Sequence, residues 1–559
     1  MATKSKHEIM TKTPIPKLVI TLAIPAIITM LITSIYNMAD TFFVGRIGDG
    51  KIGASAVSVV FSYMAIMQAI GFFFGHGSGN YISKKLGAND PSMAGKMAST
   101  AFFLAFFIGT LLLILGVVFL EPFAYLLQAN SENIDDVKSY LFYILLGSPF
   151  IITSFVLNNQ LRFQGSAYYG MIGIGIGGLL NIALDPLFIF VFDMGVAGAG
   201  LATSLSQFVS FVILLLMGTR GGNIRIRFRD FAPCKEFLVE IVKGGTPSLF
   251  RQGLSSVSVI CLNGVANVIA GTALVAGMGV AQKIMHFIFS ILLGIGQGFQ
   301  PICGYNYGAK SYDRVKKAYW FCVKYCTIII IIISVFGFIF AEDVAKLINS
   351  NLEVCSYAGA SLRFQFCTFI TMPFIVMTNM TLQNLSKVIG ASVLALVRQG
   401  AAYIPLLYAL QFFGVTGVYL VQPIADLVAL AVALPLMIKT LKELTVLEEK
   451  TKITAEDNVT GCKNQSEIFM KVVKLLYWIM FAIGAGLFVL NFIIKHTAIM
   501  ISSVVVLLIA ILLYFIHSNM KKKQDEIPKE NQRNIDLKKQ REDSYKRIRE
   551  AKKAKKNQK

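Results

Sequence analysis

Apolar residues along the chain gather in long runs that few charged residues interrupt. A helix of about 20 such residues crosses the roughly 30 Å hydrocarbon core of a bilayer. Charged or Gly- and Pro-rich breaks separate the runs, and membrane helices tolerate the Gly and Pro residues inside them. The pattern predicts fourteen membrane-spanning helices, at residues 18–45, 53–82, 95–120, 138–160, 168–191, 196–218, 238–268, 273–303, 317–340, 357–383, 390–411, 415–438, 471–494 and 497–518.

The first twelve predicted helices form two copies of six, because short segments recur at a nearly constant distance. Ile24-Pro25 in the first predicted helix is matched by Thr246-Pro247 in the seventh. Six is an even number of crossings, so both copies enter the membrane from the same side and are parallel repeats about the membrane normal. The other matched pairs, at almost the same separation along the chain, are Leu86–Asn89 with Tyr307–Lys310, Asp185-Pro186 with Ile404-Pro405, and Gly195–Gly198 with Gly414–Gly417.

The sequence therefore predicts an all-α polytopic membrane protein built from two six-helix bundles, with two extra transmembrane helices toward the C-terminus. Transporters with repeats of this kind bind substrate near the membrane midplane, between the repeats. The predicted parts are an N-terminal bundle at 1–219, an inter-bundle loop at 220–237, a C-terminal bundle at 238–440, a linker with two further helices at 441–520, and a basic tail at 521–559.

The charged residues fix the predicted orientation. Lys and Arg gather in the N-terminal segment and in alternate loops, such as the loop at 219–237, whereas the intervening loops are acidic or nearly uncharged. Positive residues favour the cytoplasmic side, so we expect both termini in the cytoplasm and the protein in the inner, or plasma, membrane. This distribution explains the net charge of +21 without a nucleic-acid partner. The basic tail is either solvated or in contact with anionic lipid.

The composition excludes other classes of protein. Hydrophobic residues make up 55% of the chain and charged residues 15%, which is unlike a soluble enzyme, a secreted disulfide scaffold or a disordered chain. The eight cysteines form no C-x-x-C pair, so neither a disulfide nor a metal framework is expected. No catalytic constellation stands at a predicted membrane face, and no filter-like repeated loop indicates a channel. We expect a non-enzyme without a cofactor.

Two carboxylates lie inside predicted helices of the first half, and an ionisable residue within a span indicates a functional site. They are Asp40 and Asp185. Asn181 precedes Asp185 by four residues and so shares its helix face; Pro186 frees a nearby carbonyl, and Thr203 lies on the next helix. These oxygens suit a hard cation such as Na⁺, and the carboxylates can carry H⁺ instead. The alternative for Asp40 is a place at the outer water interface.

The second half carries buried bases in place of these carboxylates. They are Arg251, Lys283, Arg398 and, one turn after Lys283, His286. Arg251 and Arg398 have either a structural role or a role in binding or hinging. Proline gives further candidate hinge positions, at Pro25, Pro186, Pro247 and Pro405.

Methionine, aromatic and amide side chains supply a pliable pocket, because such groups adapt to varied ligands and aromatic faces attract cations. Packing between helices or against lipid is the alternative for each of them. The candidates for a central substrate cavity are Tyr36, Asn37, Met64, Met67, Gln68, Phe150, Asn158, Lys283, His286, Phe289 and Gln297.

Several of these segments together resemble the MATE family, the multidrug and toxic-compound extrusion transporters, and are most similar to its MepA-like and DinF-like bacterial branch. The resemblance covers about residues 14–440. The segments that carry it are Met38–Gly45 (MADTFFVG), Leu161–Gly165 (LRFQG), Asn181–Pro186 (NIALDP), Gly195–Thr203 (GVAGAGLAT), Gly296–Pro301 (GQGFQP), Gly304–Lys310 (GYNYGAK) and Arg398–Gly400 (RQG).

The resemblance implies two six-helix bundles in a V around a central cavity, which export amphipathic, mostly cationic drugs or dyes in exchange for Na⁺ or H⁺. It places the family's cation site on Asp40, Asn181, Asp185 and Thr203. The chain departs from the family at Ser386, where related chains usually have glycine. It also lacks the carboxylates that some members carry in the second bundle, in the stretches matching its seventh and tenth helices.

We therefore expect a Na⁺- or H⁺-coupled multidrug efflux antiporter that works by alternating access, as a monomer, on small amphipathic cations. The nearest alternative is a flippase of the same superfamily for lipid-linked oligosaccharides or lipids. A flippase for pyrophosphate-linked lipid needs a large basic cavity, for which Arg251, Lys283 and Arg398 are the available residues.

Overall fold

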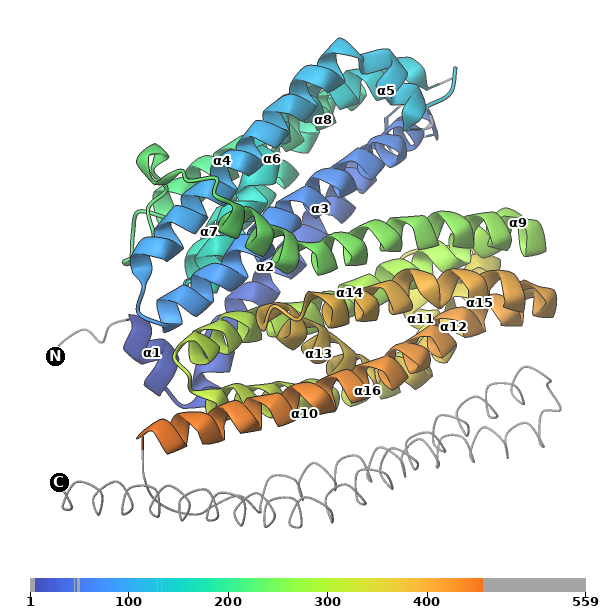
Figure 1. Cartoon of the computed structure of the whole chain (residues 1–559). Coiled ribbons are helices and arrows are strands. Elements are labelled where there is room, and N and C mark those ends of the chain that lie inside the picture. The colour runs from blue at the N-terminus through green and yellow to red at the C-terminus, as the bar shows by residue number, and fades with distance from the viewer. Residues whose placement is uncertain (1–5, 45, 48–50, 128, 132, 456–559) are drawn as a thin grey trace, which may run out of the picture. The chain divides into compact units, whose positions relative to one another are not determined.

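The computed structural model describes residues 6–455, apart from residues 45, 48–50, 128 and 132 (Figure 1). The predicted helices at 471–494 and 497–518 and the basic tail lie outside the described residues. Within the described part, every regular element is a helix. The helices of the first half are α1 (Lys6–Lys12), α2 (Ile15–Val44), α3 (Lys51–Gly87), α4 (Pro91–Val118), α5 (Leu120–Leu126), α6 (Ile134–Phe163), α7 (Ala167–Pro186), its π-helical continuation η1 (Leu187–Val191), and α8 (Gly195–Met217).

A short 3-10 turn, η2 (Phe228–Asp230), lies in the inter-bundle loop. The second half then repeats the succession of long helices. Its elements are α9 (Lys235–Gly308), α10 (Tyr312–Ile339), α11 (Ala341–Lys346), α12 (Leu352–Phe369), α13 (Met372–Asn384), α14 (Val388–Leu396), the π-helical η3 (Val397–Ala401), α15 (Tyr403–Leu410), the 3-10 turn η4 (Gln411–Phe413) and α16 (Gly414–Ala455).

The described helices account for twelve spans. Ten stretches are long and apolar enough to cross a membrane when α12 and α13, which meet at a bend of 60°, count as one. Two of the other nine also contain a break. The 74-residue α9 leaves helical geometry at Ala270 and Gly271, and the stretch 388–451 turns at Gly414, which has a φ of +62°. Each of these two is long enough for two crossings.

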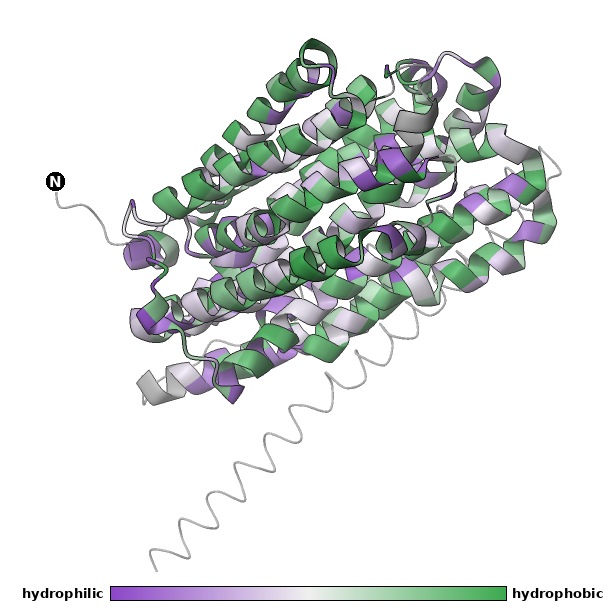
Figure 2. Ribbon diagram, turned by 90° about the horizontal axis from the view of Figure 1, so that it is seen from above, coloured by the Kyte–Doolittle hydropathy of each residue, from purple (hydrophilic) through white to green (hydrophobic). Residues whose placement is uncertain are grey.

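The surface of the described part agrees with a membrane protein. Large apolar side chains lie exposed along α10, among them Ile328, Ile332, Phe336 and Ile339. Figure 2 shows apolar residues covering the helices, with hydrophilic residues mostly toward the helix ends. Exposed apolar side chains at this density need a hydrocarbon solvent.

The internal repeat is visible in the backbone. Asn89, after α3, and Lys310, after α9, both have a left-handed φ near +60°. Gly165, after α6, and Ser386, after α13, form a second such pair, with φ of +76° and +56°. The two pairs have the same separation along the chain. A left-handed turn costs little for glycine and more for serine, so Ser386 occupies a glycine-type position, which agrees with the glycine usual there in related chains.

The last described helix is longer than the sequence pattern indicated. We expected a span at 415–438 and a polar linker from 441, but α16 continues to Ala455. Ion pairs hold the extension against the rest of the second half: Glu448 pairs with Lys316 at 2.7 Å, and Glu443 pairs with Lys387. The charges that marked this stretch as a linker are instead partners for lysines on neighbouring helices.

The two halves contact each other toward one end of the described part, here called the basic end, where Lys84, Lys235 and Arg314 lie. Lys84 on α3 donates to Ser386 at 2.6 Å, and Tyr81 donates to Glu236. Of the cross-half hydrogen bonds that the described residues make, those farthest from this end involve Ser34 on α2, Gln68 on α3, and Gln252 and Ser290 on α9. These positions are near the middles of their helices.

Helix α1 fastens the two halves at the basic end. In the first half, Lys6 donates to Ser166 at 2.7 Å, and the ring of His7 donates to the main-chain oxygen of Gly87 at 3.0 Å. In the second half, Asn306 donates to the main-chain oxygen of Met10, and Arg314 donates to that of Thr13. The segment 6–13 is thus a clasp that joins both halves.

Candidate functional site

A buried polar cluster in the first half brings together the four residues that the sequence nominated for cation binding. Asp40 stands on α2, Asn181 and Asp185 lie one turn apart on α7, and Thr203 is on α8. Asp185 is 0% exposed and Asp40 8% exposed. The two carboxylates are close enough to interact electrostatically.

Hydrogen bonds connect this cluster across its helices. The Asn181 amide donates to Asp185 Oδ1 at 3.2 Å and to Thr203 Oγ1 at 3.3 Å. Tyr140 on α6 donates its hydroxyl hydrogen to Asp40 Oδ2 at 3.3 Å and also contacts Thr203. Four helices of one bundle therefore fix the positions of the side chains.

Three oxygen atoms of the cluster remain without a hydrogen-bond partner among the described residues. They are Asp40 Oδ1, Asn181 Oδ1 and Asp185 Oδ2. A buried polar atom without a partner carries a desolvation penalty. Two carboxylate oxygens and one amide oxygen are hard ligands, which suit a hard cation, and either carboxylate can be neutralised by a proton. The donor set thus fits Na⁺ or H⁺.

Tyr140 was not among the residues that the sequence nominated. It stands six residues into α6, next to the charged start of that helix, where it looks like a residue at the membrane interface. Tyr36, nominated for the substrate cavity, instead lies beside this cluster, since its hydroxyl interacts with Gln207 and with Asp40. No spacing rule in one sequence reveals a contact between helices α2 and α6.

A second buried polar group joins the two halves. Arg162 on α6 donates to the main-chain oxygen of Gln297 at 3.0 Å and to Gln300 Oε1 at 2.8 Å, both on α9. It also donates to His76 Nε2 at 3.2 Å. Because arginine only donates, Nε2 must accept and Nδ1 carries the ring proton. That nitrogen lies 3.1 Å from Ser248 Oγ on α9, so both Arg162 and His76 cross the interface.

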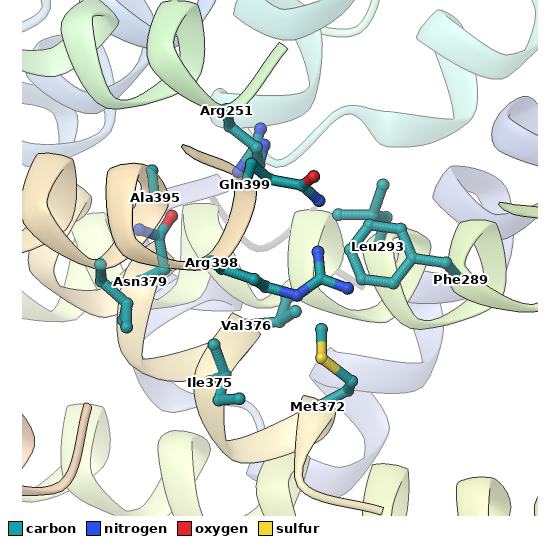
Figure 3. A pocket seen from close by; sticks show the side chains of 11 residues that line it. Arg251, Phe289, Leu293, Met372, Ile375, Val376, Asn379, Ala395, Arg398 and Gln399 are labelled. Carbon is teal, nitrogen blue, oxygen red and sulfur yellow. The ribbon is translucent and has the colours of Figure 1, made fainter. Parts of the chain in front are cut away.

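The second half contains a small cavity (Figure 3). The centre of a water molecule can occupy about 30 Å³ of it. Helices α9, α13 and α14 and the π-helical η3 enclose it. Two of the buried bases noted in the sequence, Arg251 and Arg398, line it together with the predicted cavity residue Phe289. The complete lining is Arg251, Phe289, Leu293, Met372, Ile375, Val376, Asn379, Leu394, Ala395, Arg398 and Gln399.

Arg398 has a buried carboxylate partner that the sequence argument missed. Its Nε donates to Asp426 Oδ1 on α16 at 3.0 Å, and Gln422 donates to the same oxygen at 2.8 Å. Asp426 is a single carboxylate in the otherwise apolar predicted helix 415–438, which was the available signal. The Arg398 guanidinium also lies over the Phe289 ring, 5.2 Å from its centre.

The other nominated cavity residues are scattered. Gln68 accepts from Gln252 across the halves at 3.0 Å, and Met67 is fully buried. Phe150 packs within the first half, with its ring centre 4.8 Å from that of Phe208. Lys283 and His286 are exposed and do not line the cavity described above. Met64 and Asn158 are half-buried and Gln297 is buried, while the side chain of Asn37 lies outside the described residues.

The nominated hinge prolines lie inside helices or beside irregular segments. Pro25 and Pro247 are within α2 and α9. Pro186 directly precedes the π-helical η1, and Pro405 lies four residues after the π-helical η3. Proline removes a backbone donor, which favours such departures from α-helical bonding. Their role as hinges stays a prediction.

The fold and these sites define a class: a multi-pass α-helical membrane protein with a duplicated bundle and a buried oxygen cluster in one copy. A family model described as MatE matches residues 25–187 and again residues 247–409, one match in each half. The chain belongs to the MatE family.

Known relatives agree with this assignment. The chain is 27% identical over 426 residues to a protein named multidrug export protein MepA from Staphylococcus saprophyticus, which covers 76% of this chain and 94% of the relative. It is also similar to a solved outward-facing conformation of a multidrug resistance MATE family transporter of the MOP superfamily, with a TM-score of 0.74 and 26% identity over 79% of this chain and 99% of the other.

A second solved structure is that of a MOP superfamily transporter from Pyrococcus furiosus, described as having a reverse polarity of its binding pocket that suggests a different function. It has a TM-score of 0.74 and 26% identity, and covers 80% of this chain and 100% of its own.

Proposed function

We propose that this protein is a cation-coupled multidrug efflux antiporter that exports small amphipathic, mostly cationic molecules across the plasma membrane. The MatE family and the similarity to multidrug export proteins support transport of such substrates. The observation that carries the coupling is the first-half cluster, where Asp40, Asn181 and Asp185 each keep one buried oxygen without a partner. A cation or proton supplies what these atoms lack.

Coupling follows from competition between two conformations. A ligand shifts an equilibrium only by the difference between its affinities for the two states. The cation binds at Asp40 and Asp185 and favours one state, whereas the exported molecule favours the other. The driving force is about 1.4 kcal/mol per pH unit, or about 2.3 kcal/mol per charge for each 100 mV.

The arrangement of the halves corresponds to one of these two states. Their hydrogen bonds lie from the basic end to about the middle of the helices, and positive residues favour the cytoplasmic side. We infer that the molecule is closed toward the cytoplasm and is outward-facing. Similarity to a solved outward-facing transporter supports this inference.

Transport of ethidium by the full chain in energised membrane vesicles tests the proposal, with Na⁺ and H⁺ gradients imposed separately. The variants are Asp40→Asn and Asp185→Asn, which keep the shape of the side chain and remove its charge. Asp193→Asn is the matched control, because Asp193 is exposed and lies just beyond η1 on the same chain segment.

We expect ethidium export to follow one of the two gradients, to be lost in both cluster variants and to persist in the control. The effective gradient identifies the ion. Export that is indifferent to Asp185→Asn would contradict the cation site. If folded, inserted protein moves no ethidium under either gradient, the antiporter proposal fails and the flippase of lipid-linked substrates becomes the better hypothesis.

A further inference from the structure

The second half holds one half-buried base, Arg251, whose charge the described residues leave without a bonded partner. Arg251 and Arg398 both line the cavity of Figure 3. Arg398 is neutralised by Asp426, but the described residues offer Arg251 no hydrogen bond or ion pair. With two guanidinium groups and one carboxylate, this corner of the second half has a net charge of +1.

The neighbouring charges make this excess larger rather than smaller. Arg251 interacts repulsively with Arg398, and Arg162 of the first half interacts repulsively with Arg251. Arg162 is stabilised by neutral acceptors on α9, namely Gln297 and Gln300. The ring of His76 also lies close enough to Arg251 to interact with it electrostatically. An anion in the cavity would therefore meet net attraction, and a cation net repulsion.

The shape and lining of the cavity narrow the kind of anion. A guanidinium presents its donors in a planar fork that matches a carboxylate with two parallel hydrogen bonds. The space admits a group of only a few atoms. Phe289, Met372 and Val376 give the cavity an apolar wall. The part of the ligand next to its charged group is therefore apolar or aromatic.

We propose that this cavity binds the carboxylate of an amphipathic transported molecule, with Arg251 as the residue that pairs with it. The inference rests on the proposed function and deepens it. The proposed function already assumes substrates with a cationic group, and Arg251 adds a partner for a carboxylate, so the preferred substrates are zwitterions that carry both groups. Arg398 is a positioning residue, held by Asp426 beside the Phe289 ring.

The test compares two dyes that differ in one group: rhodamine B, which has a free carboxylate, and its ethyl ester, which keeps the cationic ring system. Binding of each to the purified full chain in detergent is measured by fluorescence anisotropy at neutral pH. The variants are Arg251→Gln and Arg251→Lys. Arg363→Gln is the matched control, because Arg363 is a second-half arginine paired with Glu342 away from the cavity.

We expect the parent and Arg363→Gln to bind rhodamine B about tenfold more tightly than the ester, the usual effect of a charged hydrogen bond. Arg251→Gln should bind both dyes alike, with unchanged affinity for the ester. Arg251→Lys should keep part of the preference, because it keeps the positive charge but not the planar fork. The ester also reports whether each variant is folded. Equal binding of the dyes by the parent, or a preference that survives in Arg251→Gln, would overturn the inference.

If Arg251→Gln does not fold, the parent and Arg251→Lys still test the carboxylate site. If neither of them prefers rhodamine B over its ester, the site is rejected. Failure of the inference is distinct from failure of the proposed function. Gradient-driven export of the ester without a preference for the carboxylate removes only the anion site. A carboxylate preference in binding without gradient-driven export of either dye removes only the antiporter.

Discussion

Gly87 at the end of α3 packs against the main chain of α9, and Gly308 at the end of α9 packs against the main chain of α3. A Cβ atom on Gly87 would be 2.1 Å from the main-chain oxygen of Tyr305, and one on Gly308 would be 2.0 Å from that of Lys84. Each oxygen belongs to the residue three positions before the other glycine. The two glycines follow the spacing of the internal repeat, so equivalent positions of the two copies meet where the halves close.

We expect Gly87→Ala and Gly308→Ala to open the basic end. Both substitutions put a methyl group where a main-chain oxygen stands, so the halves must separate there. Cys303, buried between them on α9, is the reporter in a chain whose other cysteines are replaced. Its reaction with a maleimide should accelerate about tenfold or more, which corresponds to about 1–3 kcal/mol of overpacking.

Gly253→Ala is the control for this pair, since no atom lies within 4 Å of the Cβ it would add. Labelling of Cys303 at the parent rate in both Gly87→Ala and Gly308→Ala would show that the halves do not separate at this contact.

His76 should tolerate replacement by glutamine but not by leucine. Its Nε2 accepts a hydrogen bond from the buried Arg162, and a glutamine oxygen can do the same. The repeat has a glutamine at the equivalent position, because Gly75-His76-Gly77 corresponds to Gly296-Gln297-Gly298. Leucine leaves a guanidinium donor unpaired, at a cost of about 1–3 kcal/mol. Thermal unfolding in detergent should rank parent and His76→Gln close together and His76→Leu well below; equal melting of the two variants would contradict this role.

The Arg398–Asp426 pair should show strong coupling in a double-mutant cycle. Removing one member of a buried ion pair leaves the other charge uncompensated and costs about 3–5 kcal/mol, whereas replacing both with apolar groups costs much less. We expect Asp426→Leu and Arg398→Met each to lower the unfolding temperature sharply. The double variant should melt above both. Additive losses would mean that the two side chains act independently.

The stability of the folded protein should rise as the pH increases above 8, because Lys6 loses its proton. Burial lowers the pKa of Lys6 in the clasp from 10.5 to about 8, so between these values the unfolded chain binds more protons than the folded one. Folding is therefore penalised below pH 8, and the penalty disappears as the pH approaches 10.5. The unfolding temperature of the parent, relative to Lys6→Met, should increase over this interval. Lys12→Met, at an exposed lysine of the same helix, is the control; a flat difference would contradict the prediction.

Much of this fold could be read from the sequence because its signals are local. Apolar run length indicated the spans, and recurring Pro and Gly segments indicated the repeat. Ser386 was noted only through the family resemblance, as a serine where related chains usually have glycine. The Asn181–Asp185 pair followed from helical spacing alone. Local signals do not specify which helices touch, so the contact of Tyr140 with Asp40 was missed. Asp426 was overlooked although it was visible as a charge in an apolar run.

The cavity residues were harder to predict for a related physical reason. Aromatic and methionine side chains pack equally well against a ligand, another helix or lipid, so their identity does not tell which way they face. Phe150 faces aromatic residues of its own half, whereas Phe289 faces a cavity. Charged residues were mixed guides: Asp40 and Asp185 are buried in one polar cluster, whereas Lys283 and His286, predicted to be buried, are exposed.

The clasp formed by residues 6–13 affects how the protein can be engineered. Lys6 is tied to Ser166 in one half, while the main-chain oxygens of Met10 and Thr13 are tied to Asn306 and Arg314 in the other. Any state open at the basic end has to release one of these attachments. A folded affinity tag fused directly before this segment therefore adds bulk to a segment that must move when the halves separate. Such a tag changes the balance between the conformations of the protein before any ligand or ion is present.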